Sequence, residues 1–217
     1  IAGFAVAALS LSSLINPAVA TPAAAEVGNQ TIGAVNGSDI LTNAIPGVAD
    51  RIILSPTEDA STGMNVTFRA DTADTTVEYR PTGTDQVRTA TTTETGRTNR
   101  VHQFAELADL TPATEYEYRI ITADGASGPW DTFRTAAAAP QDFDFIYFGD
   151  AQNGLTEEAK ISARAAYNAV PNAALAVHTG DQINDADDDE QWNQWFEAQG
   201  PTAVSYTHLT LPTNREV

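Results

Sequence analysis

The chain has 217 residues, 42% of them hydrophobic, which suits one or two domains with packed cores. It contains no cysteine, and this excludes both a disulfide framework and a thiolate metal site. The formal net charge is -18 and Lys160 is the only lysine, which argues against binding nucleic acid or an anionic membrane through a basic patch.

Residues 1–25 have the pattern of a secretory signal. An apolar run covers 1–15, and Ala18-Val19-Ala20 follows as a small-residue cleavage site, with Ala23-Ala24-Ala25 as the alternative. A membrane-spanning helix is the competing interpretation, but the run is short and interrupted by serines. We therefore expect a secreted or periplasmic protein whose sequence begins inside its own signal, followed by an irregular lead-in over 26–49.

Residues 50–136 change to short segments of alternating apolar and polar residues, a pattern typical of a β-sandwich. The segment 107–119 resembles the corner before the sixth strand of a fibronectin type III domain, where a tyrosine hydroxyl bonds back to the backbone. Tyr116 is the expected corner tyrosine, and Tyr118 follows it on the same face. The seven expected strands cover 51–55, 64–69, 76–80, 86–92, 101–107, 115–122 and 130–134.

The predicted sandwich shows no cluster of His, Asp and Glu at the spacing of metal ligands. His102 stands alone on a strand, where a histidine is expected to be packed or solvated. We therefore expect a structural or docking module. An alanine-rich linker over 137–142 joins it to the segment that follows.

Residues 142–181 have the pattern of a strand, a helix and a second strand, with an aspartate after each strand. The apolar run 143–148 ends in Gly149-Asp150, a helical stretch covers 156–170, and the apolar run 173–178 ends in Thr179-Gly180-Asp181. Parallel strands joined by a helix present their following loops at the same edge of the sheet. We therefore expect Asp150 and Asp181 to lie together at that edge. The expected apolar face of the helix consists of Ala159, Ala163, Ala166, Tyr167 and Val170.

The order of these segments resembles the calcineurin-like metallophosphoesterases of the purple acid phosphatase type, over about residues 51–202. The motifs that carry the resemblance are the corner 110–116, Phe148-Gly149-Asp150 and the stretch 178–184, His-Thr-Gly-Asp-Gln-Ile-Asn. The resemblance implies an all-β, fibronectin III-like sandwich followed, over 143–203, by the start of an α/β metallophosphatase domain. It also implies a metal-dependent hydrolase of phosphate esters, either a secreted acid phosphatase or a phosphodiesterase.

By the same resemblance, Asp150 binds the first of two metal ions and Asp181 bridges both, the ions being Fe, Zn or Mn. Two such ions activate water and neutralise charge on the phosphoryl oxygens of the substrate. Two positions depart from the family pattern. Gln152 stands where the family has histidine, and Asn184 stands where the purple enzymes have tyrosine, so both are weak candidate ligands with neutral oxygens. The simpler interpretation of each aspartate is a turn cap.

The acidic run 185–190 alternates as a calcium-binding EF-hand loop does. Glu190 stands where that loop needs glycine and Phe196 where it needs a bidentate glutamate, so the calcium interpretation ranks low. We expect instead that the acids cap a helix with an apolar face of Trp192, Trp195 and Phe196, ended by Gly200. His178, just before the second motif, is expected to pack in the core.

Residues 204–217 match no part of the family pattern and are expected to be a non-native tail. Together with the incomplete signal, this predicts a fragment that lacks the later metal motifs and is inactive by itself. The alternative function is a non-catalytic secreted binding or adhesion protein with a degenerate phosphoesterase domain. The particular phosphate ester, the metal identity and the oligomeric state stay open.

Overall fold

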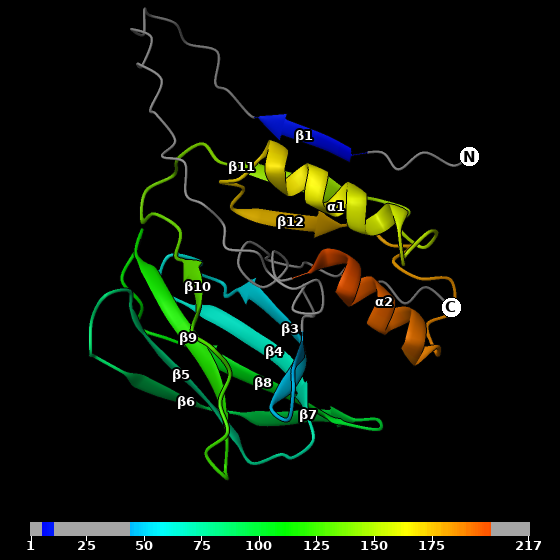
Figure 1. The fold of residues 1–217 in the computed structure, drawn as a ribbon. Helices are drawn as coiled ribbons and strands as arrows, with labels where there is room; N and C mark the ends of the chain where they lie inside the picture. The colour runs from blue at the N-terminus through cyan, green and yellow to red at the C-terminus, as the bar shows by residue number, and fades with distance from the viewer. Residues whose placement is uncertain (1–5, 11–43, 201–217) are drawn as a thin grey trace, which may run out of the picture.

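The structure is a computed structural model, and it describes residues 6–10 and 44–200. It contains a β-sandwich and a smaller α/β part (Figure 1). The expected cleavage sites, most of the expected lead-in and the expected tail at 204–217 lie outside the described residues. In the described ranges, no helix is both long enough and apolar enough to span a membrane.

The sandwich is built from two antiparallel sheets. One has the strand order β10-β9-β5-β6 and the other β2-β3-β4-β8-β7. The bounds are β2 (Ala44–Ile45), β3 (Ala49–Pro56), β4 (Met64–Ala70), β5 (Thr75–Pro81), β6 (Arg88–Thr91), β7 (Thr93–Arg97), β8 (Val101–Leu107), β9 (Glu115–Thr122) and β10 (Asp131–Arg134).

The seven expected strands are present. Those expected over 101–107 and 115–122 have these bounds, the other five have shifted ends, and the sequence analysis missed β2 and β7. The strand expected over 86–92 is shorter, because the chain leaves one sheet after β6 and joins the other as β7. All five residues of β7 are exposed, so it carries no alternation of apolar and polar residues. The lead-in expected to be irregular up to residue 49 already contains β2, which pairs with β3.

Alternate residues of the strands fill the space between the two sheets. On β9, Tyr116, Tyr118 and Ile120 are all buried, as the expected alternation requires. The backbone N–H of Thr111 donates to the Tyr116 hydroxyl at 2.9 Å, and this confirms the tyrosine corner. Tyr116 also stacks on Phe133 with ring centroids 5.5 Å apart.

The α/β part consists of β11 (Asp144–Phe148), α1 (Glu158–Ala169) and β12 (Leu175–His178). The two strands are parallel neighbours, as predicted, and Phe148 lies opposite His178. The predicted helix face is also confirmed: Ala159, Ala163, Ala166 and Tyr167 are buried, and Val170 is partly buried against them.

A third strand, β1 (Val6–Ser10), pairs antiparallel with β11 and completes this sheet (Figure 1). The sequence analysis assigned this segment to the signal and did not anticipate the strand. The pairing has a simple physical reason, since the free edge of β11 is a row of unpaired backbone donors and acceptors that an extended segment satisfies.

The second helix, α2 (Asp189–Gln199), lies between the sandwich and α1 (Figure 1). The side chain of Asp188 caps it by accepting from the backbone N–H groups of Glu190 at 2.9 Å and Gln191 at 3.2 Å. The capping interpretation of the acidic run is therefore confirmed. Trp195 and Phe196 are buried, Trp192 is partly buried, and Gly200 ends the helix, as expected.

Candidate metal site

Asp150 and Asp181 follow the carboxyl ends of two adjacent parallel strands, β11 and β12. The ladder between the strands continues past their ends, because the Thr179 N–H donates to the Phe148 carbonyl at 3.1 Å. The two turns therefore begin side by side, and a Cβ added at Gly149 would lie 3.2 Å from the Thr179 hydroxyl oxygen.

Both aspartates have left-handed backbone conformations, with φ of 58° at Asp150 and 51° at Asp181. Aspartate is among the few non-glycine residues that adopt this conformation readily. Non-glycine residues held there cluster at functional sites, where the surrounding structure fixes them. The two aspartates thus share a left-handed φ at one sheet edge.

A side-chain contact ties the two loops together. The Asn184 amide nitrogen donates to the backbone carbonyl of Gln152 at 3.0 Å, so the loop after β12 is linked to the loop after β11. The Gln152 amide nitrogen in turn donates to Oδ1 of Asp150 at 3.2 Å. The four residues that the sequence indicated as ligands thus lie on two loops that are in direct contact.

The donor set has the chemistry that a hard cation requires. The side chains of Asp150, Asp181 and Asn184 are accessible to solvent, and within the described part of the chain the Asp181 carboxylate accepts no hydrogen bond. Gln152 presents its nitrogen to Asp150, and a half-turn of the amide would present its oxygen instead. Carboxylate and amide oxygens suit Mg²⁺, Mn²⁺ or ferric iron, so these residues fit part of a metal site.

The four candidate residues would supply only part of a coordination shell. Across 6–10 and 44–200, no group of three or more His, Asp or Glu side chains converges at ligand spacing. Hard divalent cations take about six or more ligands. The four candidate residues alone would therefore not complete a coordination shell.

His178 lies one residue before the second turn and belongs to the core, as expected. It is 1% exposed, its ring stacks on Phe148 at 4.9 Å, and it contacts the Trp195 ring edge-on at 4.9 Å. Burial lowers the pKa of His178 to about 4, so the ring is neutral at physiological pH. His178 thus packs against Phe148, the last residue of β11.

A second polar cluster joins the sandwich to α2, and sequence reasoning missed it. The Arg51 guanidinium donates to Oδ1 of Asp189 at 2.7 Å and to Oδ1 of Asn193 at 2.8 Å. Arg69 donates to the same Asp189 oxygen at 2.9 Å and binds both oxygens of Asp50 at 2.9 Å. In the sequence Arg69 is one of several arginines within predicted strands, and only the structure shows that it is buried.

The electrostatics of this cluster follow from burial and pairing. Burial is the largest influence on the pKa of Asp189 and raises it, but Arg51 and Arg69 together outweigh burial and hold this pKa below its usual range. The pKa of Arg51 is lowered, first by burial and then by the nearby charge of Arg69. A cavity of about 740 Å³ lies beside the cluster, with Trp192, Phe196 and His102 in its walls.

Comparison with known proteins bears mainly on the sandwich. Residues 49–135 match the family model of the purple acid phosphatase N-terminal domain. No curated protein matches the chain. The sandwich is therefore an N-terminal domain of the purple acid phosphatase kind, and the expectation for this segment is confirmed.

Among solved structures, the chain is similar to purple acid phosphatase PPD1 from yellow lupin (Lupinus luteus) seeds. The identity is 16%, the TM-score is 0.64, and the match covers 76% of this chain and 35% of the lupin chain. This chain thus spans about a third of the lupin protein's length. It also matches the RsgI4 sensor domain of Pseudobacteroides cellulosolvens at 19% identity and TM-score 0.34, covering 42% of this chain and 93% of that one.

Proposed function

We propose that the chain is part of a secreted hydrolase of phosphate esters with a dinuclear metal centre, in which Asp150 binds one ion and Asp181 bridges both. One observation carries the proposal: two left-handed aspartates end adjacent parallel strands directly behind a purple acid phosphatase N-terminal domain. The ions, Fe, Zn or Mn, would supply Lewis-acid activation of water and neutralise charge on the substrate.

The residues of this chain would hold and orient that centre. Asp181 would be held in common by both ions, and its negative charge would offset their mutual repulsion. Gln152 keeps the Asp150 carboxylate oriented through its amide, at a nitrogen to oxygen distance of 3.2 Å. Asn184 fixes the spacing of the two loops through the Gln152 carbonyl. The site edge is open to solvent, so a phosphate ester in solution can reach it.

The first experiment asks whether this edge binds a metal at all, and uses the 217-residue chain with Mn²⁺ alone. Paramagnetic broadening of backbone amide signals should be strongest at 149–152 and 180–184. Asp150→Asn and Asp181→Asn should each weaken the broadening. The matched control is Asp85→Asn, which removes the same charge from an exposed loop between β5 and β6 of the sandwich and should leave the broadening at 149–152 unchanged.

The second experiment concerns the longer protein to which this chain would belong. Asp181→Asn should lower bound metal from about two ions per chain towards none and abolish hydrolysis of chromogenic phosphomonoesters and phosphodiesters. Asp150→Asn should leave about one ion bound, because the second ion keeps its own ligands. Full metal content and activity in Asp181→Asn would overturn the proposal and leave the alternative, a non-catalytic binding protein.

A further inference from the structure

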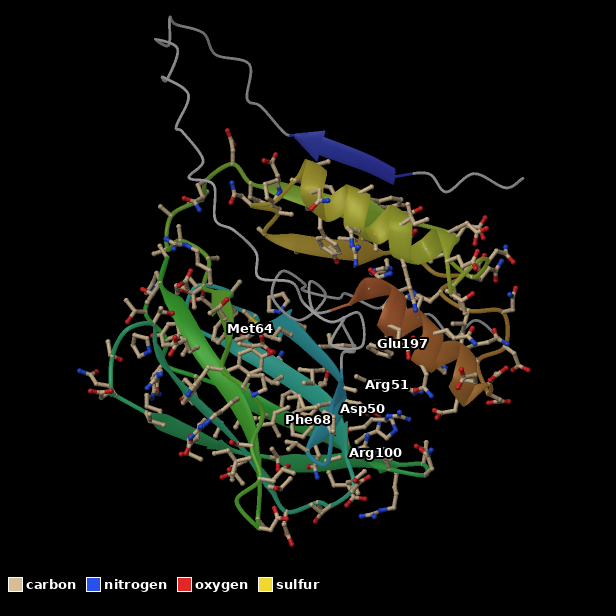
Figure 2. The ribbon with its side chains drawn as sticks, viewed as in Figure 1. Asp50, Arg51, Met64, Phe68, Arg100 and Glu197 are labelled. Carbon is tan, nitrogen blue, oxygen red and sulfur yellow. The ribbon has the colours of Figure 1, made fainter. Side chains whose placement is uncertain are left out.

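The polar cluster between the sandwich and α2 is connected to the candidate metal site by a series of hydrogen bonds that runs through the backbone of α2. It begins at the sandwich edge, where Asp50, Arg51 and Arg100 gather on the side that faces α2 (Figure 2). Arg51 is directed at the helix, since its guanidinium donates to the carbonyl and carboxylate of Asp189 and to the side chain of Asn193.

The backbone at Arg51 is held in an unusual conformation that aims this side chain. Its φ is 50°, and the pairing of β3 with β4 changes register between Asp50 and Ile53, as at a β-bulge. Bulges re-aim side chains, and a non-glycine residue at positive φ costs free energy that other interactions must offset. At Arg51 the hydrogen bonds and the ion pair with α2 provide that offset.

From α2 the series continues into the loop after β12. Close to the arginine contacts on the helix, the Gln191 amide oxygen accepts from the backbone N–H groups of Asn184 at 2.9 Å and Asp185 at 3.2 Å. Its amide nitrogen donates to Asp188 at 2.9 Å. Gln191 therefore fixes the far end of the loop that starts at Asp181.

The last two contacts reach the candidate ligands. Asn184 donates to the Gln152 carbonyl at 3.0 Å, and Gln152 donates to the Asp150 carboxylate at 3.2 Å. We infer that Arg51 is a positioning residue for the metal site: through α2 and Gln191 it sets the loop that carries Asp181 and Asn184. This inference rests on the proposed function, and it gives the sandwich a role in metal binding beyond docking.

The test replaces Arg51 by methionine, which keeps an unbranched side chain and removes its bonds to α2. Removing a positive charge should by itself tighten the binding of a cation, because the field at the site becomes more negative. If Arg51 positions the loop, its replacement should instead weaken the binding of the cation. We expect the Mn²⁺ dissociation constant to rise roughly 3- to 10-fold, at or below the lower end of the range for outer-shell partners of metal ligands.

The matched control is Arg80→Met. Arg80 pairs with Glu117 inside the sandwich at 2.7 Å and lies over the Trp130 ring, so this variant loses the same charge without losing a contact to α2. It should leave Mn²⁺ affinity unchanged or slightly tighter. Gln191→Ala serves as a second variant, which alters no charge and cuts the series between α2 and the loop. It should weaken Mn²⁺ binding like Arg51→Met.

Amide hydrogen exchange at Asn184 and Asp185 provides a readout that needs no metal. Both amides should exchange faster in Arg51→Met and in Gln191→Ala than in the wild type or in Arg80→Met. If Arg51→Met lowers only the melting temperature, while Mn²⁺ affinity and exchange far below that temperature match the wild type, the inference is overturned. If the wild type fails to bind Mn²⁺ but exchange changes as expected, metal binding by this chain is refuted and the coupling of Arg51 to the loop stands.

Discussion

Replacing His178 with phenylalanine should remove a loss of stability that the wild type suffers as the pH falls from 6.5 to 4. His178 is 1% exposed, lies between the rings of Phe148 and Trp195, and its Nε2 has no hydrogen-bond partner in the described part of the chain. Burial lowers its pKa from an ordinary value of 6.5 to about 4. Phenylalanine keeps an aromatic ring against Phe148 and cannot take up a proton.

The sign follows from which state binds the proton. Between pH 6.5 and pH 4 the unfolded chain protonates His178 and the folded chain does not, so acid stabilises the unfolded state. The gap between about 4 and 6.5 corresponds to about 3 kcal/mol in all, at 1.36 kcal/mol for each pH unit. About 2 kcal/mol of this is already lost at pH 5.

Urea unfolding at pH 7 and pH 5, followed by tryptophan fluorescence, measures this difference. The wild type should lose about 2 kcal/mol more between the two pH values than His178→Phe does. His102→Gln is the comparison. His102 is half-buried, and its pKa is also lowered, first by burial and then by Arg69 and Arg51, so this variant should remove a smaller part of the loss than His178→Phe does. Equal pH dependence in the wild type and His178→Phe would refute the assignment of a neutral, buried His178.

Three further predictions concern the corner, the helix cap and the site. Tyr116→Phe should lower the free energy of unfolding by about 1 kcal/mol, because the Thr111 N–H loses its acceptor. Tyr118→Phe should leave this free energy unchanged, because the buried Tyr118 hydroxyl has no hydrogen-bond partner in the described ranges. Equal losses for the two variants in urea unfolding would contradict this. Asp188→Ala should reduce the helix signal in circular dichroism and lower the melting temperature, and Asp188→Asn should do so less, since an amide oxygen still accepts from the helix N-terminus. With ferric iron bound, the longer protein should show no intense tyrosinate absorption, because Asn184 stands at the position of the expected phenolate; a strong visible band would show that this alignment is wrong.

The sandwich could be predicted where one face of a strand is buried. Tyr116 and Tyr118 alternate with polar residues, so their strand and its inward face were readable from the sequence alone. β7 could not be found in this way, because all of its residues are exposed and it has no apolar face. β1 was missed for a different reason: an apolar segment carries no signal of which edge it will pair with.

The candidate site could be predicted only in the part that depends on chain order. Parallel strands joined by a helix have their following loops at one edge of the sheet, and this rule predicted that Asp150 and Asp181 lie together. The structure has that topology. The contacts of Arg51 and Arg69 with Asp189 span 138 and 120 residues, and ion pairs between such distant segments leave no period in the sequence. The sequence therefore indicated the carboxylates but not the contacts that orient them.

The charge of the chain explains why the proposed chemistry depends so strongly on metal. With a net charge of -18, and with exposed Asp185 and Asp187 close to the site, the field at this edge attracts cations and repels phosphate esters. Binding two cations beside Asp150 and Asp181 would reverse the local sign before an anionic substrate arrives. The carboxylates that would repel an anionic substrate thus also favour the cations whose binding would allow that substrate to approach.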